Sequence, residues 1–133
     1  MLNRGIEEDG LLDTLSKNNK ALVAYGPLAE GLLTDKYLNG MDDNVKIHWS
    51  NQFVIKHGKD ELVKKLNELN DIAKNRDQTL AQMSLAWLLH DKTVASVVTG
   101  ASKINHLEDN LKAVQNLNFT QDELDQIDKI VKE

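Results

Sequence analysis

Apolar residues recur at helical spacing along much of the chain. In residues 59–75 they line one face opposite a charged face, which predicts an amphipathic helix whose apolar side lies in the core. Residues 80–90 follow Thr79 as a candidate cap and are apolar on most sides, so this helix is expected to be largely buried. Further stretches with helical spacing are 7–18, 105–115 and the segment that Thr120 opens.

Short apolar runs interrupt this helical pattern. Residues 21–25 end at Gly26-Pro27, and residues 93–99 end at Gly100. Such runs, bounded by turn residues, suit buried parallel strands. Strands that alternate with helices predict an α/β fold with a parallel sheet and right-handed crossovers. Because a parallel pair needs cover on both faces and neighbours at both edges, the pattern indicates part of a larger α/β structure.

Residues 38–57 show no clear period. They combine Asn39-Gly40, Asp42-Asp43-Asn44 and His48-Trp49 with scattered apolar positions. We therefore expect a long irregular loop around 38–57 within one domain that spans residues 1–133. Loops of this length in compact domains are typically functional or mobile.

Composition narrows the function classes. A chain of 133 residues, 41 % hydrophobic and 28 % charged, is typical of one soluble globular domain or a piece of a larger one. The net charge of −5 gives no reason to expect nucleic acid or an anionic membrane as partner. The absence of cysteine excludes disulfides, zinc-thiolate sites and a cysteine nucleophile. With no long apolar run and no signal pattern, a cytoplasmic location is expected.

Several motifs, in order along the chain, resemble the aldo-keto reductase family. Residues 25–37 read Tyr-Gly-Pro-Leu-Ala-Glu-Gly-Leu-Leu-Thr-Asp-Lys-Tyr and are similar to the family's segment after the seventh barrel strand. Residues 81–89, Ala-Gln-Met-Ser-Leu-Ala-Trp-Leu-Leu, resemble the helix before strand eight. Residues 97–103 and 107–110 resemble the exit of strand eight and the helix that follows it. Within the family the chain looks most like glyceraldehyde-phosphate reductases and the related potassium-channel beta subunits.

The resemblance implies the C-terminal part of a (β/α)8 TIM barrel, with about two or three parallel strands and flanking helices. Such barrels need about 250 residues. In the family the catalytic Asp, Tyr, Lys and His lie in earlier strands, so the resemblance implies no catalytic residue in this chain. It also implies that the chain alone is inactive, although its relatives reduce aldehydes or ketones with NADPH.

The same segments offer chemistry for the phosphate and adenosine end of NADP. The small-residue loop 26–31 follows a strand, where backbone N–H groups can approach phosphate oxygens, and Lys36 adds positive charge nearby. Ser102 and Lys103 stand just ahead of a helix N-terminus and would suit a 2′-phosphate. The full set of predicted cofactor-binding residues is Gly26, Pro27, Leu28, Gly31, Lys36, Ser102, Lys103, His106, Asp109 and Asn110. The resemblance implies that His106 lies near the ribose phosphate and that Asp109 and Asn110 reach the adenine amine.

Some positions depart from the family pattern. Gly26 replaces a common Ser, and Glu30 adds a carboxylate to a loop that faces phosphate. No clear Arg stands on the cofactor-covering loop, where Lys46 or His48 is a possible substitute. Taken alone, Gly-Pro indicates a turn and Ser-Lys indicates capping with a solvated lysine.

Two functions from different classes follow. The first is the NADP-binding portion of an aldo-keto reductase. The second is a non-enzymatic remnant or assembly module that oligomerises through exposed barrel edges, with a second copy or with a complementary barrel fragment. A third possibility is that the remaining strands lie on further polypeptide.

Overall fold

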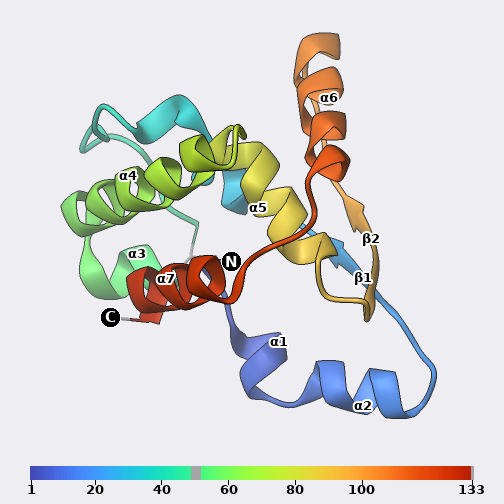
Figure 1. The fold of residues 1–133 in the computed structure, drawn as a ribbon. Helices are drawn as coiled ribbons and strands as arrows, with labels where there is room; N and C mark the ends of the chain where they lie inside the picture. The colour runs from blue at the N-terminus through green and yellow to red at the C-terminus, as the bar shows by residue number, and fades with distance from the viewer. Residues whose placement is uncertain (49–51, 133) are drawn as a thin grey trace.

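A computed structural model describes residues 1–48 and 52–132 of the chain (Figure 1). Both predicted strands occur, and the predicted helices before, between and after them are present, with two helices in place of the first and an additional helix over Gln52–His57. The α-helices and strands are α1 (Gly5–Glu8), α2 (Leu11–Lys17), β1 (Leu22–Tyr25), α3 (Gln52–His57), α4 (Lys59–Asn75), α5 (Leu80–Leu89), β2 (Val94–Val98), α6 (Ile104–Leu111) and α7 (Gln121–Lys132). Short 3-10 helices are η1 (Ala29–Gly31), η2 (Asp35–Tyr37) and η3 (Lys112–Gln115).

The strands β1 and β2 form a two-stranded parallel sheet. Leu22 pairs with Val94 and Tyr25 pairs with Val98, with an irregularity after Leu22. Residues of β1 alternate between half-buried and exposed, and Val23, Tyr25 and Val98 are exposed. The predicted α/β class with parallel strands is confirmed, and one face of the sheet is uncovered in the described structure.

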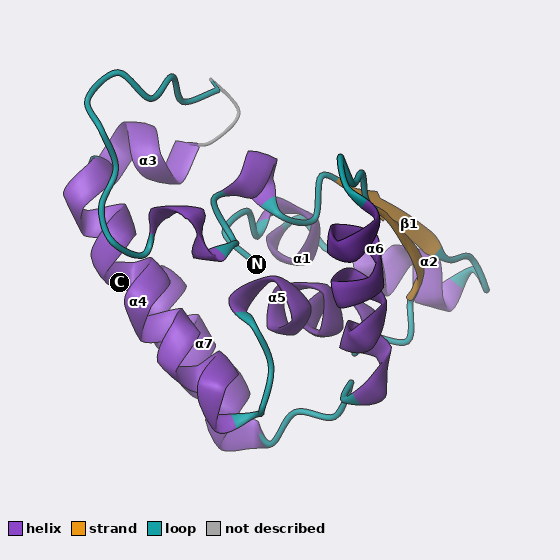
Figure 2. Cartoon of the chain, turned by 90° about the horizontal axis from the view of Figure 1, so that it is seen from above, coloured by secondary structure: helices purple, strands orange, loops and turns teal. Residues whose placement is uncertain are grey.

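The hydrophobic core lies between α4, α5 and α7 rather than around the sheet (Figure 2). Leu62, Leu66 and Leu69 of α4 lie at helical spacing and are fully buried. Met83 of α5 and Ile127 of α7 are also fully buried. Helices with the length and apolarity to cross a membrane are absent from residues 1–48 and 52–132.

Capping chemistry defines the start of both α5 and α7. The Thr79 side chain accepts the Gln82 N–H, and the Gln82 side chain accepts the Thr79 N–H, which completes a capping box. Thr120 and Glu123 make the same reciprocal pair of bonds at the start of α7. The caps expected at Thr79 and Thr120 are therefore confirmed.

The single helix predicted over residues 7–18 is wrong. The chain forms α1 and α2 instead, with Gly10 between them at φ 72°. A left-handed residue cannot continue an α-helix, and glycine adopts this conformation without steric cost. The leucine spacing that suggested one helix belongs to α2 alone.

Substituting Gly10 with alanine should destabilise the chain by about 1 kcal/mol, because a Cβ is strained at positive φ. Urea denaturation would measure the change. Gly5→Ala is the matched control, because Gly5 lies in α1, outside the left-handed region. A Gly10→Ala variant as stable as Gly5→Ala would show that this backbone conformation is not required.

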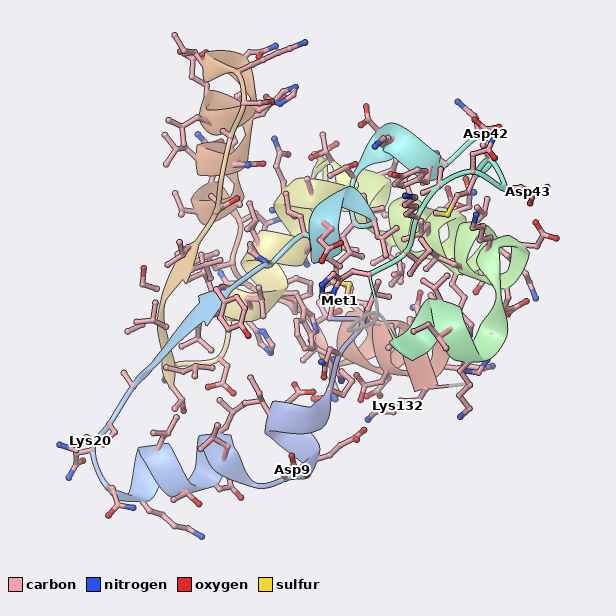
Figure 3. The ribbon with its side chains drawn as sticks, turned by 180° about the vertical axis from the view of Figure 1, so that it is seen from behind. Met1, Asp9, Lys20, Asp42, Asp43 and Lys132 are labelled. Carbon is pink, nitrogen blue, oxygen red and sulfur yellow. The ribbon has the colours of Figure 1, made fainter. Side chains whose placement is uncertain are left out.

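The irregular segment predicted at 38–57 is shorter than expected. Residues 38–48 lack regular structure, but Gln52–His57 forms α3, and residues 49–51 lie outside the described chain. The segment is fixed to α4, since the Lys59 ammonium donates to the carbonyls of Asp42 and Asp43 at 2.9 and 2.6 Å (Figure 3). A hydrogen bond from a lysine to a backbone carbonyl does not depend on the residue type of the acceptor. The sequence pattern therefore did not indicate that this segment is attached to α4.

Candidate functional site

The carboxyl ends of both strands lie at the same edge of the sheet. Tyr25 and Val98 are the last residues of their strands and pair with each other. The loop that begins at Gly26 and the segment that begins at Thr99 therefore leave the sheet side by side. Ligands of α/β proteins bind at this edge, outside the carboxyl ends of the strands. The two predicted halves of the cofactor site are thus neighbours.

The loop after β1 has a run of left-handed backbone conformations. Gly26, Ala29, Glu30 and Gly31 all have positive φ, between 49° and 89°. The Ala29 N–H donates to the Gly26 carbonyl at 3.1 Å, which closes the turn around Pro27 and Leu28. A Cβ added at Gly26 or Gly31 would meet no atom of the described residues within 4 Å. The backbone here is open to an incoming group, and strained left-handed residues of this kind cluster at ligand-binding loops.

Charged side chains near this loop have partners. The Glu30 carboxylate lies 3.6 Å from Nδ1 of His48, which joins the loop to the irregular segment 38–48. The Lys36 ammonium lies over the Tyr37 ring, 4.8 Å from its centroid. The structure therefore places Lys36 on the turn after the loop, in contact with an aromatic ring.

The N-terminus of α6 is exposed and lacks a side-chain cap in the described structure. Lys103 is the N-cap residue with extended backbone, and it makes no side-chain cap bond with the described residues. The first helical bond runs from the Leu107 N–H to the Lys103 carbonyl, so the N–H groups before Leu107 have no acceptor inside the helix. Ser102 and Lys103 are both exposed. Ser102 and Lys103 therefore stand next in sequence to N–H groups without helical acceptors, at the positive end of α6.

The remaining predicted residues lie along α6. His106, Asp109 and Asn110 are spaced to share one side of the helix; His106 and Asp109 are exposed and Asn110 is half-buried. The Asp109 carboxylate accepts a bond from Lys112 at 2.7 Å. This hydrogen bond, together with the negative charge of Asp109, raises the pKa of Lys112. His106, Asp109 and Asn110 therefore lie on α6, and Ser102 lies just before the N-cap residue of this helix.

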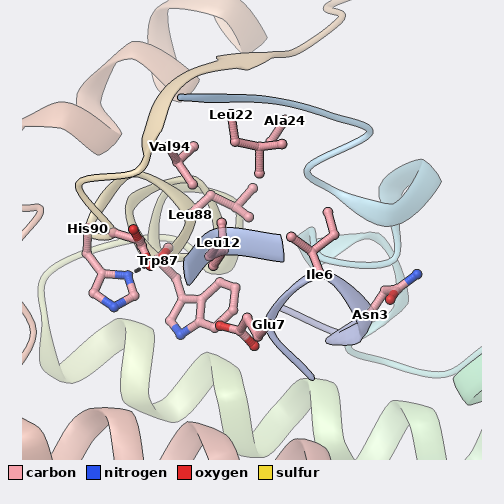
Figure 4. Close-up of a pocket in the computed structure, with 11 residues that line it drawn as sticks. Asn3, Ile6, Glu7, Leu12, Leu22, Ala24, Trp87, Leu88, His90 and Val94 are labelled. Atoms are coloured by element: carbon pink, nitrogen blue, oxygen red, sulfur yellow. Dashed lines mark hydrogen bonds between the residues drawn. The ribbon is translucent and has the colours of Figure 1, made fainter. Parts of the chain in front are cut away.

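A small cavity of about 70 Å³ lies away from this edge, between α1, α2, β1 and α5 (Figure 4). It is lined by Asn3, Ile6, Glu7, Leu12, Leu22, Ala24, Trp87, Leu88, His90, Asp91 and Val94. The predicted cofactor residues are all described, and none of them lines it. Because its walls are mainly apolar side chains of a strand and the helices that cover it, we interpret this cavity as a packing gap.

Two polar residues that the sequence analysis did not identify, Arg4 and Gln82, make contacts between separate parts of the chain. The Arg4 guanidinium lies 4.4 Å from the Trp87 ring centroid and pairs with Glu7 and Asp128. Gln82 is buried and connects α5 to α6. The capping role of Gln82 could have been predicted, because it is a glutamine three residues after the capping residue Thr79. Groups of His, Asp and Glu with metal-binding geometry are absent from the described part of the chain.

Comparison with known proteins shows the family. A family model described as Aldo/keto reductase family matches residues 1–132. L-glyceraldehyde 3-phosphate reductase of Escherichia coli (strain K12) is 44 % identical over 133 residues, which cover 97 % of this chain and 38 % of that protein. A probable voltage-gated potassium channel subunit beta of Oryza sativa subsp. japonica is 30 % identical, over 99 % of this chain and 42 % of that protein. The chain thus spans about two fifths of the length of these relatives.

Solved structures agree with the fold. The glycerol dehydrogenase AKR11B4 from Gluconobacter oxydans superposes with a TM-score of 0.77 at 25 % identity and covers 97 % of this chain and 39 % of its own. The holo form of the aldo-keto reductase AKR11C1 from Bacillus halodurans gives a TM-score of 0.74 at 26 % identity, with the same coverage. The predicted family and the predicted partial barrel fold are confirmed: this chain belongs to the aldo/keto reductase family.

Proposed function

We propose that the chain holds the phosphate and adenosine end of NADP in an aldo-keto reductase that reduces aldehydes or ketones. One observation carries this proposal: the open β1 loop and the open N-terminus of α6 leave the same edge of the parallel sheet. The cofactor supplies the hydride in such chemistry, and the protein supplies binding and orientation. The catalytic groups are proposed to lie outside this chain.

The residues present fit an anionic dinucleotide. Open backbone at Gly26 and Gly31 allows the pyrophosphate to approach N–H groups of the loop, with Pro27 and Leu28 shaping the turn. Ser102 and Lys103 would bind the 2′-phosphate through a hydroxyl and an ammonium, which form charge-assisted bonds. Farther along α6, His106 would lie near the ribose, and Asp109 and Asn110 would accept from the adenine amine. Lys36 would add a positive charge at the far side of the loop.

Glu30 is the residue that fits least well, because a carboxylate repels phosphate. Its ion pair with His48 offsets part of that repulsion when the histidine is protonated. Both side chains are about half exposed, so solvent also screens the charge. We therefore propose that Glu30 weakens pyrophosphate binding without preventing it.

Lys103→Ala should weaken NADPH binding about tenfold, which corresponds to about 1.4 kcal/mol, while it leaves the weaker binding of NADH unchanged. The difference is expected because only NADPH carries the 2′-phosphate. Isothermal titration with both nucleotides would measure it. Lys92→Ala is a matched control, because Lys92 is exposed at the opposite end of β2. Equal affinities for NADPH and NADH in the unmodified chain would contradict the proposal, as would carbonyl reduction by this chain alone.

The alternative function, an assembly module, is favoured by a separate observation. Apolar residues of α6 and η3 form an exposed stripe at helical spacing: Ile104, Leu107, Leu111 and Val114. The uncovered sheet face adds Tyr25, whose surface is 89 % exposed. Patches of this kind mark interaction surfaces. The molecular mass in solution distinguishes the two functions, because a strictly monomeric chain would count against self-assembly.

A further inference from the structure

Helix α6, which carries the proposed ribose and adenine contacts, stands apart from the core. It projects beyond the packed helices in Figure 1, and of its residues only Asn110 is not exposed. A helix with so little burial gains little orientation from packing. Some other contact must therefore set its position relative to the strand ends.

We propose that Gln82 is the positioning residue that holds α6 for the adenosine half of the nucleotide, an inference that rests on the proposed function. The Gln82 side-chain amide donates from Nε2 to the backbone carbonyl of Asp109 at 3.0 Å. Asp109 and its neighbour Asn110 are the proposed adenine contacts. The bond is therefore made to the part of α6 where small displacements would matter most.

Both ends of the Gln82 amide are engaged, which fixes its orientation. Oε1 accepts the Thr79 N–H at 3.0 Å, and Nε2 faces the Asp109 carbonyl, so a flipped amide would lose both bonds. The side chain is only 7 % exposed, so water competes little for these bonds.

This amide joins α6 to the helix that packs against β2. Helix α5, which carries Gln82, packs against β2, the strand that leads to Ser102 and Lys103. The position of α6 is thus tied through α5 to the sheet edge. Binding groups need support of this kind to stay within about 0.5 Å of their working geometry.

The chemistry of Gln82 allows its two roles to be separated by substitution. Gln82→Glu keeps an acceptor for the Thr79 N–H, and glutamate serves as well as glutamine in a capping box. It loses the donor to Asp109 and places a carboxylate against that carbonyl. Gln82→Met removes both bonds without adding charge. Thr79→Ala removes the hydroxyl that caps α5 but leaves the bond from Gln82 to Asp109 possible.

The test measures NADPH affinity by titration and backbone hydrogen exchange across Ile104–Leu111 in the full chain. We expect about tenfold weaker NADPH binding and faster exchange in α6 for both Gln82→Glu and Gln82→Met. Thr79→Ala should lower the urea midpoint while NADPH affinity stays within about twofold of the unmodified chain. Inorganic pyrophosphate, which lacks adenosine, should bind all variants alike.

Two results would overturn the inference that Gln82 positions α6. Unchanged NADPH affinity and unchanged α6 exchange in the two Gln82 variants would overturn the inference. An equal loss in Thr79→Ala would also overturn it, since the role of Gln82 would then be only structural. If the unmodified chain does not bind NADPH, the proposed function fails separately, and the exchange of α6 still decides whether Gln82 holds the helix.

Discussion

Replacing Arg76 with alanine should lower the free energy of unfolding by about 2 kcal/mol. Arg76 follows α4 and is only 7 % exposed. Its Nη1 donates to the Glu123 carboxylate at 2.7 Å and to the Asn118 carbonyl at 3.0 Å. Removing the guanidinium takes a donor from the half-buried Glu123 carboxylate and from two backbone carbonyls, and it leaves a cavity where the buried Arg76 side chain was.

The same guanidinium joins parts of the chain that are distant in sequence. Its Nη2 donates to the Asn116 carbonyl at 3.3 Å, and its carbon lies 3.6 Å from the centroid of the Phe119 ring. These contacts connect the end of α4 with the segment that leads from η3 to α7. Arg76→Lys keeps the charge but not the planar fork, so it should recover only part of the loss.

Urea denaturation at several pH values would check this prediction. Burial opposes ionisation of Glu123, but hydrogen bonds from Thr120 and Arg76 and the charge of Arg76 outweigh it and lower the pKa of that carboxyl. Its contribution to stability is therefore present above the ordinary pKa and is lost as the pH falls through the lowered value. Arg76→Ala should show a smaller acid loss than the unmodified chain. Lys74→Ala, at an exposed ion pair, is the control and should change stability by less than about 1 kcal/mol.

Truncating Leu66 to alanine should cost about 3 kcal/mol, because the change leaves a cavity in the packed core. Leu66 is 0 % exposed and lies on α4, which packs against both α5 and α7. The identical substitution at Leu111, which is 61 % exposed on α6, should cost less than about 0.5 kcal/mol in the monomer. Comparing the urea midpoints of the two variants measures the same substitution at a buried and at an exposed position.

The Leu111 variant also separates the proposed functions. If the chain self-assembles through the apolar stripe of α6, Leu111→Ala should reduce the associated fraction in sedimentation experiments, although it changes monomer stability little. If both variants lost equal stability in a monomeric chain, α6 would have to be packed in solution, contrary to the arrangement described above.

Local patterns predicted the regular elements well. The bounds of α4 match the predicted 59–75, because leucine spacing, a preceding glycine and a charged outer face all point to one helix. The α1–α2 junction at Gly10 was not predicted, because the leucine spacing lies wholly after Gly10 and does not show where the helix begins. Residues 52–57 gave no helical period. Helix α3 is short, and of residues 54–57 only Val54 is buried, so little in the local pattern marks it as a helix.

Long-range polar contacts could not be predicted from the sequence. The partners of Arg76 lie 40 or more residues away, apart from the nearby Gln78, and two of them are backbone carbonyls with no residue-type signature. The bond from Gln82 to a carbonyl on α6 has the same character. By contrast, the placement of the Ser102-Lys103 pair at a helix N-terminus followed from strand-then-helix order alone.

The pairing of β1 with β2 also sets an order for folding. Leu22 and Val94 are joined by a long stretch of chain that contains α4 and α5, so the ladder must close a large loop before it gains any hydrogen bonds. Contacts of this range form late, whereas the helices between the strands form from local contacts. We therefore expect the sheet edge that carries the proposed cofactor site to be completed last. A variant that slows docking of α4 onto α5 should delay the appearance of nucleotide binding more than the appearance of helical structure.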